Sequence, residues 1–353
     1  MDPQTFIIGP NDRILVTGAA GFIGHRLVRQ LLDYGFRNLR CLVRPSANPE
    51  RVQALRLCSD GARLELMYGN LLSRDDCATA CKDAAVVFHL AAGRGEKSYS
   101  DAFMNSVVTT RNLIEASAQS GCLARFVNVS SFAVYSNRKK KSGRLLDELC
   151  PLEEHPEARG EAYCFAKAKQ DEIVMEYGQR LGIPYVIVRP GYVYGPGNEP
   201  ISGRVGTNTF GVFLHLGGGN TIPLTYVDNC ADAIALAGLR KGVEGEVFNV
   251  VDDDLPSSRG FLRLYKRRVK PLRSFYVPHA VSYVLCHFWE RYSVRSKGQL
   301  PPAYNRARWH ANWKSTKYSN LKAKEQLGWA PRVPTSVGLE RYFAACRRKD
   351  EHA

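Results

Sequence analysis

Short apolar runs alternate with amphipathic segments through the first half of the chain. Runs at residues 13–17, 39–43, 64–68, 85–90 and 125–129 have the length and composition of buried strands. Helical periodicity appears at residues 25–32, 100–120 and 163–180. Because strands that alternate with helices form a parallel sheet wrapped by helices, the sequence predicts an α/β fold.

A glycine-rich turn separates the first strand from the first helix, in the stretch ILVTGAAGFIG at residues 14–24. Gly18, Gly21 and Gly24 allow a tight turn, a close approach of backbone to a pyrophosphate, and packing of the helix on the strand. The N-terminus of that helix favours an anion. The pattern therefore predicts a dinucleotide site, and the alternative is a turn without a ligand.

The residue at the end of the second strand normally meets the adenosine ribose of a bound dinucleotide. Arg44 holds this position, and an arginine accommodates a 2′-phosphate where an acidic residue would accept from the 2′-hydroxyl. The sequence thus favours NADP over NAD. Small residues after the fourth strand, Ala91 and Ala92, leave room for the cofactor across the sheet edge.

The composition is that of a globular protein, with 44% hydrophobic and 24% charged residues among 353. The formal net charge of +15 favours an acidic partner such as nucleotide phosphates or a membrane surface, but no nucleic-acid-binding motif is present. Ten dispersed cysteines indicate reduced thiols in a cytoplasmic protein. Residues 1–11 resemble a short extension and lack the features of a signal peptide.

Polar side chains with catalytic potential follow the fifth strand and begin the helix at residues 163–180. Ser130 and Ser131 lie where ligands of parallel sheets bind, although serines there also cap turns. Tyr163 and Lys167 share one helix face at i, i+4 spacing. A neighbouring cation lowers the pKa of a tyrosine from about 10, so Tyr163 is predicted to exchange a proton with a substrate hydroxyl.

The motifs taken together resemble the extended short-chain dehydrogenase/reductase family of nucleotide-sugar epimerases, dehydratases and 3-beta-hydroxysteroid and dihydroflavonol-type dehydrogenases. The resemblance covers nearly the whole chain and rests on TGAAGFIG at 17–24, HLAA at 89–92, VSSFAVY at 129–135, YCFAK at 163–167, VRPGYVYGPG at 188–197, TYVDNCADAI at 225–234 and LGWAPRV at 327–333. It implies a Rossmann-type doubly wound parallel sheet in residues 12–197 and a smaller C-terminal α/β substrate-binding lobe in residues 198–353. The chain is expected to cross between the two.

The family's functional residues transfer to matching positions here. The resemblance implies that Tyr163 is the acid/base, that Lys167 lowers its pKa and holds the nicotinamide ribose, and that Ser131 contacts the reacting oxygen. Cofactor contacts are implied at Gly18, Gly21, Phe22, Ile23, Gly24, Arg44, Asn70, Leu71, Leu90, Ala91, Ala92, Tyr163, Lys167, Pro190 and Val193. Substrate contacts are expected at Arg204, Asn208 and Tyr226, and no metal site is expected.

Several positions depart from the family pattern. Ser106 stands where the family usually has an active-site asparagine, unless Asn105 shifts by one residue to take its place. Phe132 and Ala133 follow Ser131 where sugar dehydratases need an acidic pair, so dehydration is not expected. The dipeptide at 191–192 is Gly-Tyr where many sugar epimerases have Phe-Asn, which favours the hydroxysteroid-like and reductase-like branches.

The segment 274–292 is the most apolar part of the C-terminal third, and basic residues flank it on both sides. It is too short to span a bilayer, so two interpretations remain: a helix packed on the substrate lobe, which we favour, or a peripheral membrane contact. Apolar residues on the helices at 100–120 and 162–180 exceed one stripe and predict a homodimer through these helices.

Three functions fit the sequence. The favoured one is an NAD(P)-dependent oxidoreductase or epimerase acting on a secondary hydroxyl or keto group of a nucleotide-linked sugar. The second is a dehydrogenase of an apolar, sterol-like or flavonol-like substrate near a membrane. The third is a non-catalytic dinucleotide-binding redox sensor, and the presence of Ser131, Tyr163 and Lys167 argues against it.

Overall fold

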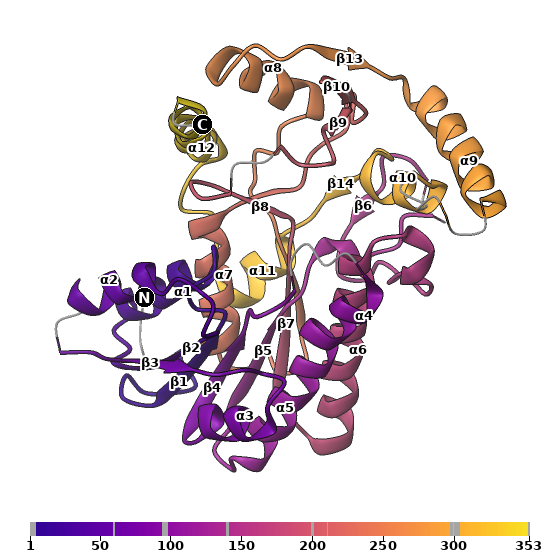
Figure 1. The fold of residues 1–353 in the computed structure, drawn as a ribbon. Coiled ribbons are helices and arrows are strands. Elements are labelled where there is room, and N and C mark those ends of the chain that lie inside the picture. Colours follow the sequence, from indigo (N-terminus) through magenta and orange to yellow (C-terminus); the bar gives the residue numbers. More distant parts are fainter. Residues whose placement is uncertain are drawn as a thin grey trace.

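A seven-stranded parallel sheet forms the centre of the larger lobe, in the order β12-β7-β5-β4-β1-β2-β3 (Figure 1). The computed structural model describes residues 5–58, 61–93, 98–138, 141–198, 201–209, 211–296, 299 and 304–351. The strands of the sheet are β1 (Arg13–Thr17), β2 (Asn38–Val43), β3 (Arg63–Tyr68), β4 (Ala84–His89), β5 (Arg125–Val129), β7 (Tyr185–Pro190) and β12 (Val247–Val250). The predicted α/β fold with a Rossmann-type parallel sheet is confirmed.

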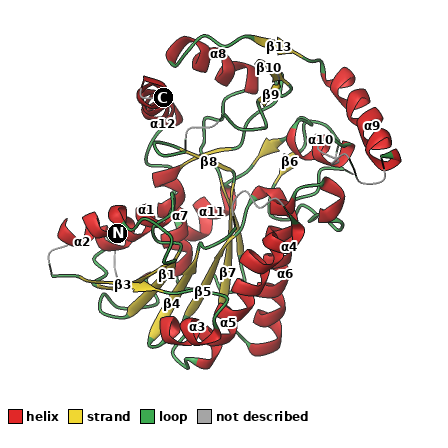
Figure 2. Cartoon of the chain, viewed as in Figure 1, coloured by secondary structure: helices red, strands yellow, loops and turns green. Residues whose placement is uncertain are grey.

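Helices cover both faces of the sheet, because successive residues of a strand point to opposite sides. Ile14 and Val16 of β1 belong to one hydrophobic core, whereas Leu15 belongs to the other. The first core lies under α1 (Gly24–Asp33), α2 (Glu50–Cys58), α7 (Val227–Leu239) and α11 (Leu321–Leu327). The second lies under α3 (Arg74–Cys81), α5 (Thr109–Gln119) and α6 (Ala162–Leu181) (Figure 2).

A smaller lobe lies beyond the carboxyl ends of the sheet strands (Figure 1). Its strands are β8 (Tyr192–Tyr194) paired with β11 (Leu224–Tyr226), and β9 (Gly206–Thr209), β10 (Val212–His215) and β13 (Ser274–Tyr276) in a second sheet. Its helices are α8 (Ser258–Arg268), α9 (His279–Arg295), α10 (Arg306–Asn312) and α12 (Thr335–Glu351). Aromatic side chains fill its core, among them Tyr194, Tyr226, Phe261, Tyr342 and Phe343.

The chain crosses between the lobes more than once. After β11 it returns to the large sheet as α7 and β12, and then leaves again for α8. The short strand β6 (Leu145–Leu146) pairs with β14 (Lys317–Tyr318), which follows α10. At the other end of the chain, Phe6 is buried against the large core, so part of the N-terminal extension packs on the domain.

The helix expected at residues 100–120 is interrupted. It consists of α4 (Tyr99–Ala102), a π-helical turn (Phe103–Val108) and α5. Single π-turns inside helices occur often at functional sites. Here the extra residue in the turn brings Ser106 inward, where it is buried, and leaves Asn105 exposed.

Among the described residues, no helix combines the length and the apolarity that crossing a bilayer requires. No disulfide joins the cysteines whose side chains are described, which are Cys41, Cys77, Cys81, Cys122, Cys150, Cys164, Cys230, Cys286 and Cys346.

Candidate active site

The glycine turn after β1 is built so that backbone atoms lie in close contact. Gly18 has a φ of +68°, and a Cβ there would lie 2.9 Å from the amide nitrogen of Ala91, in the segment after β4. A Cβ on Gly24 would lie 2.1 Å from the carbonyl oxygen of Gly18. Both positions therefore require glycine, and the turn brings the start of α1 directly onto the end of β1.

The N-terminus of α1 is suited to an anion. Ile23, at its N-cap, provides no side-chain hydrogen bond to the helix, and no acidic residue stands in the first turn. The positive end of the helix dipole is therefore not neutralised by a side chain of that turn. Together with the glycine cradle, this geometry fits the pyrophosphate of a dinucleotide.

Other predicted cofactor residues follow the carboxyl ends of neighbouring parallel strands, so they lie along the same edge of the sheet. Arg44 follows β2 and is exposed. Asn70 follows β3 and is exposed, and its Oδ1 accepts from the amide of Leu72 at 3.0 Å. The half-buried residues Leu90, Ala91 and Ala92 follow β4.

The remaining predicted cofactor residues vary in accessibility. Leu71 is buried, and so is Pro190 at the end of β7. Val193 in β8 is half-buried, as are Phe22 and Ile23 in the glycine turn.

A basic residue that the sequence analysis missed lies next to the glycine turn. Arg51 and Phe22 both lie close to Gly197. A Cβ built on Gly197 would be 3.5 Å from the guanidinium nitrogens of Arg51 and 3.6 Å from the ring of Phe22. Arg51 also acts on His25, whose pKa is lowered chiefly by burial and further by Arg26 and Arg51. A sequence signal existed, because Arg51 follows Arg44 closely in the segment after β2.

Tyr163 and Lys167 lie at the start of α6, as the i, i+4 spacing predicted. Tyr163 is 41% exposed, whereas Lys167 is buried. Lys167 Nζ donates to the carbonyl oxygen of Val129, the last residue of β5, at 2.7 Å. Burial lowers the pKa of Lys167 to about 8, and Asp171 opposes this shift. The ammonium is thus anchored to the sheet, one helical turn from an accessible phenol.

Ser130 and Ser131 have different environments. Ser130 is buried, and its hydroxyl donates to Asp171 Oδ2 at 2.9 Å. Ser131 is half-buried, and its Oγ accepts from the amide of Ala133 at 3.2 Å, so it caps the short 3-10 helix Phe132–Val134. The Ser130 hydroxyl therefore uses its proton on Asp171, whereas the hydrogen bond of Ser131 to the amide of Ala133 uses its oxygen as an acceptor.

A buried ion pair beneath these residues was also missed. The Asp171 carboxylate accepts from Arg189 Nε at 3.0 Å, from Ser130, and from Asn128 Nδ2 at 3.0 Å. Burial alone would lower the pKa of Arg189, but the adjacent carboxylate of Asp171 raises it. Arg189 also donates to the hydroxyl of Tyr135 at 3.0 Å. The pair therefore joins β5, β7 and α6 behind the candidate site.

A second buried chain of hydrogen bonds contains His89, at the end of β4. Its Nδ1 lies 2.9 Å from Thr17 Oγ1, and its Nε2 lies 2.9 Å from Thr110 Oγ1. The Thr110 hydroxyl donates to the carbonyl of Ser106 at 2.6 Å, so it must accept from His89 Nε2. His89 is therefore the neutral tautomer with its proton on Nε2. Burial lowers its pKa to about 3, with a smaller contribution from Lys167.

The structure shows which of Ser106 and Asn105 faces the sheet, a point that the sequence left open. Its Oγ accepts from the amide of Gly93, after β4, at 3.1 Å. Its carbonyl accepts from Gln170 Nε2 of α6 at 3.2 Å. Ser106, rather than Asn105, thus faces the sheet and connects the β4 edge to the helix that carries Tyr163.

The residues predicted to meet substrate are dispersed. Arg204 is half-buried and donates to the carbonyl of Ala311 at 2.9 Å. Asn208 is exposed on β9. Tyr226 is only 1% exposed and packs edge-on against Tyr194 in the core of the smaller lobe.

The departure at Gly191 has a structural cause. A Cβ at this position would lie 2.3 Å from the carbonyl oxygen of Pro223. The amide of Tyr192 donates to the same carbonyl at 2.6 Å, where β8 meets β11. A larger side chain at residue 191 would therefore disrupt this strand pair.

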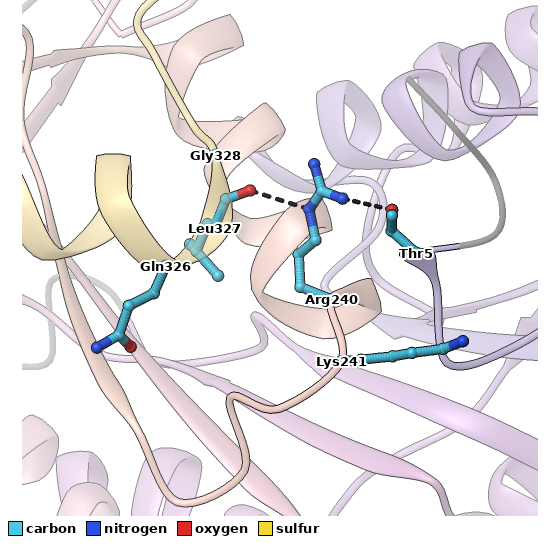
Figure 3. A pocket seen from close by; sticks show the side chains of 6 residues that line it. All are labelled: Thr5, Arg240, Lys241, Gln326, Leu327 and Gly328. Atoms are coloured by element: carbon cyan, nitrogen blue, oxygen red, sulfur yellow. Dashed lines mark hydrogen bonds between the residues drawn. The ribbon is translucent and has the colours of Figure 1, made fainter.

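An open hollow of about 370 Å³ lies elsewhere, lined by Thr5, Arg240, Lys241, Gln326, Leu327 and Gly328 (Figure 3). Arg240 crosses it and donates to the carbonyl of Leu327 at 2.9 Å. Its backbone carbonyl accepts from Arg125, the first residue of β5. The hollow is thus at the amino edge of the sheet, opposite the edge that carries Tyr163.

Comparison with known proteins identifies the family. The sequence model of the NAD dependent epimerase/dehydratase family matches residues 14–250. The chain belongs to this family. The resemblance to extended short-chain dehydrogenase/reductases is confirmed, and the chain is an enzyme of the NAD(P)-dependent type.

The relatives that match this chain are named for different activities. A 4-hydroxy-2-methyl-3-oxo-4-farnesyl-3,4-dihydroquinoline-1-oxide ketoreductase from Stigmatella aurantiaca is 27% identical over 93% of this chain and 95% of its own length. A trifunctional UDP-glucose 4,6-dehydratase, epimerase and reductase from Arabidopsis thaliana is 27% identical over 67% of this chain. The match spans only 36% of the plant protein's length.

The fold also matches solved structures. The UDP-glucuronic acid 4-epimerase from Bacillus cereus, in complex with UDP-glucuronic acid and NAD, superposes with a TM-score of 0.70. It is 23% identical, and the match covers 96% of this chain and 99% of the epimerase. At this identity the likeness concerns the fold.

The His89 hydrogen bonds make stability depend on pH. Because the pKa of His89 is about 3 when folded and 6.5 when exposed, only the unfolded chain binds a proton between these values. The free energy of unfolding should therefore fall as the pH falls from 6.5 toward 3, by up to about 1.4 kcal/mol per pH unit from this residue.

Urea unfolding at several pH values tests this expectation. His89→Gln should have a shallower pH dependence than wild type, whereas His155→Gln, at an exposed histidine, should not. Equal slopes for wild type and His89→Gln would contradict it.

Proposed function

We propose that this chain is an NAD(P)-dependent oxidoreductase or epimerase that acts on a secondary hydroxyl or keto group through Ser131, Tyr163 and Lys167. The observation that carries the proposal is the pairing of an accessible Tyr163 with a buried Lys167 held by the end of β5. Both lie on the edge of the sheet that also carries the glycine turn. A redox sensor would not need this arrangement.

Bound nicotinamide supplies or accepts the hydride in this chemistry. Tyr163 takes the proton from the substrate hydroxyl during oxidation and returns it during reduction. The Lys167 ammonium, one turn away, favours the tyrosinate that accepts the proton. Ser131 donates to the reacting oxygen. Phe132, which stacks on Tyr318 with ring centroids 5.6 Å apart, offers no carboxylate beside it, and dehydration is therefore not proposed.

Tyr163→Phe tests the acid/base role. The variant should bind the cofactor as wild type does. Its turnover should be about 10² to 10⁴-fold slower, because phenylalanine lacks only the hydroxyl that exchanges the proton. Stopped-flow absorbance of the nicotinamide and a cofactor titration measure the two quantities. Tyr99→Phe, at another exposed tyrosine beside α6, is the matched control and should retain activity. Full turnover of Tyr163→Phe would refute the assignment.

We further propose that NADP is preferred over NAD. Arg44 is exposed at the end of β2, and Arg51 provides a second guanidinium beside the glycine turn. Guanidinium groups bind phosphate through charge-assisted, bidentate hydrogen bonds. Two such groups at this end of the sheet suit a 2′-phosphate better than a 2′-hydroxyl.

Arg44→Asp should shift the preference from NADP toward NAD, because the new carboxylate repels the phosphate and accepts from the ribose. Dissociation constants for both cofactors, measured by fluorescence titration, give the preference. Arg111→Asp, an equal change in charge at an exposed position of α5, should leave it unchanged. A wild type that prefers NAD, with no change in the variant, would rule out this role of Arg44.

For the substrate, we propose a nucleotide-linked sugar first, because a relative named for UDP-glucose chemistry matches 67% of this chain. An apolar ketone or alcohol is the second candidate. It is favoured by the relative named as a ketoreductase of a farnesylated dihydroquinoline oxide, which matches 93% of this chain, and by the Gly-Tyr dipeptide at 191–192. Thermal stabilisation by a panel of nucleotide sugars and sterols separates the two. An epimerase would also recycle its nicotinamide, whereas a dehydrogenase changes the absorbance stoichiometrically.

We also propose a homodimer. Among the apolar residues of the two helices that the sequence analysis proposed for the interface, Leu113, Ile114, Val174 and Tyr177 belong to the core beneath the chain's own α5 and α6. Apolar residues that stay exposed on α4 and the π-helical turn include Tyr99, Phe103 and Met104, which are 38%, 42% and 45% exposed. They are the surface on which a twofold contact would depend.

Light scattering at low micromolar concentration should give about twice the chain mass of 39.4 kDa. Phe103→Glu should halve this mass, because it places a charge in the apolar contact. A wild-type mass near that of one chain at every concentration would exclude the dimer.

A further inference from the structure

Helix α9 (His279–Arg295) lies at the outer edge of the smaller lobe, beyond α10 (Figure 1). One face packs on the protein. Ser282 is buried and accepts from Trp309 Nε1 at 2.9 Å, and the ring of Tyr283 meets that of Trp309 edge-on at 5.0 Å. Glu290 pairs with Arg306 at 2.9 Å. The packed helix favoured by the sequence analysis is thus present on this side.

The opposite face of α9 is apolar and exposed. It is formed by Val281, Val284, Leu285, Phe288 and Tyr292, which recur at three- and four-residue spacing and which we call the outer stripe. Leu285, Phe288 and Tyr292 are 57%, 63% and 60% exposed. Large apolar side chains that share one helix face and remain in solvent indicate an interaction surface.

The charges around the outer stripe are basic. Arg291 and Arg295 are exposed on the last turns of α9, and Arg267, Arg268 and Arg273 are exposed in the segment before it. Glu290 is the single acidic residue of α9, and it pairs with Arg306 on the inner face. The chain as a whole carries a formal net charge of +15.

The basic residues around the outer stripe indicate which kind of partner binds there. A second copy of this chain, docked through the same stripe, would gather the arginines of both copies around one interface, where the acidic residue of α9, Glu290, is already paired with Arg306. An anionic lipid surface instead satisfies both features, because acyl chains receive the apolar side chains and phosphates attract the arginines. The inner face of α9 packs on the protein, and no described helix is long and apolar enough to cross a bilayer, so α9 would lie in the interface plane.

We propose that α9 is an interfacial anchor, which docks the enzyme on anionic membranes through its outer stripe with Arg291 and Arg295 on the lipid phosphates. The inference is independent of which substrate the enzyme uses. It requires the accessible surface of α9 and no change in the fold.

Vesicle co-sedimentation of the full chain tests the anchor. Wild type should bind vesicles that contain roughly one-third phosphatidylserine more tightly than pure phosphatidylcholine, and the binding should weaken as salt screens the charges. Leu285→Glu or Phe288→Glu should reduce binding by about tenfold or more, because each places a carboxylate at the apolar contact. Arg291→Gln with Arg295→Gln should reduce binding to anionic vesicles by about fivefold for each arginine.

Leu181→Glu is the matched control, since Leu181 is 51% exposed at the C-terminal end of α6, in the other lobe. It should bind vesicles as wild type does. The proposal is overturned if wild type stays in the supernatant with both vesicle types, or if Leu181→Glu and Leu285→Glu lose equal affinity. It is also overturned if Leu285→Glu converts a dimer to a monomer in light scattering without affecting vesicle binding.

Discussion

The buried carboxylate of Asp171 is the constraint on which the geometry of the candidate site depends. A charge removed from water is unfavourable unless ionic and hydrogen-bonding partners surround it. Asp171 obtains them from Arg189 on β7, from Asn128 on β5 and from Ser130 just after β5. Since Asp171 lies one turn after Lys167 on α6, satisfying this carboxylate fixes the rotation of the helix on the sheet. The same rotation directs Lys167 to the carbonyl of Val129 and leaves Tyr163 accessible.

The cofactor edge depends on a different requirement, which is close backbone approach. Gly18 lies against Ala91 and Gly24 lies against Gly18, so the turn and the segment after β4 have little freedom to separate. The hydrogen bonds of Thr17, His89, Thr110 and Gln170 then connect this edge to α6 through buried side chains. The dinucleotide cradle and the catalytic helix are therefore held by one continuous polar network beneath the surface.

Local pattern was sufficient for much of this structure. Apolar runs predicted β1 to β5, the glycine spacing predicted the turn, and the i, i+4 spacing placed Tyr163 and Lys167 on one face of α6. The buried network could not be predicted in the same way, because Asn128, Asp171 and Arg189 are far apart in the sequence and meet only when β5 and β7 pair. One signal was present, since Asp171 continues the spacing of Tyr163 and Lys167 by another four residues. The burial of Tyr226 could not be predicted locally either, because its position in the motif does not show which aromatic residues of the smaller lobe pack around it.

The position of β12 in the sheet affects the order in which the larger lobe can form during synthesis. β7 lies between β5 and β12, so its outer edge has no partner until Val247–Val250 has been synthesised. Between the two strands the chain forms β8, β9, β10, β11 and α7, most of which belong to the smaller lobe. A nascent chain that has reached α7 therefore presents an unpaired, apolar strand edge while the rest of the sheet is complete. During translation, the sheet of the larger lobe therefore cannot be completed before β8 to β11 of the smaller lobe have been synthesised.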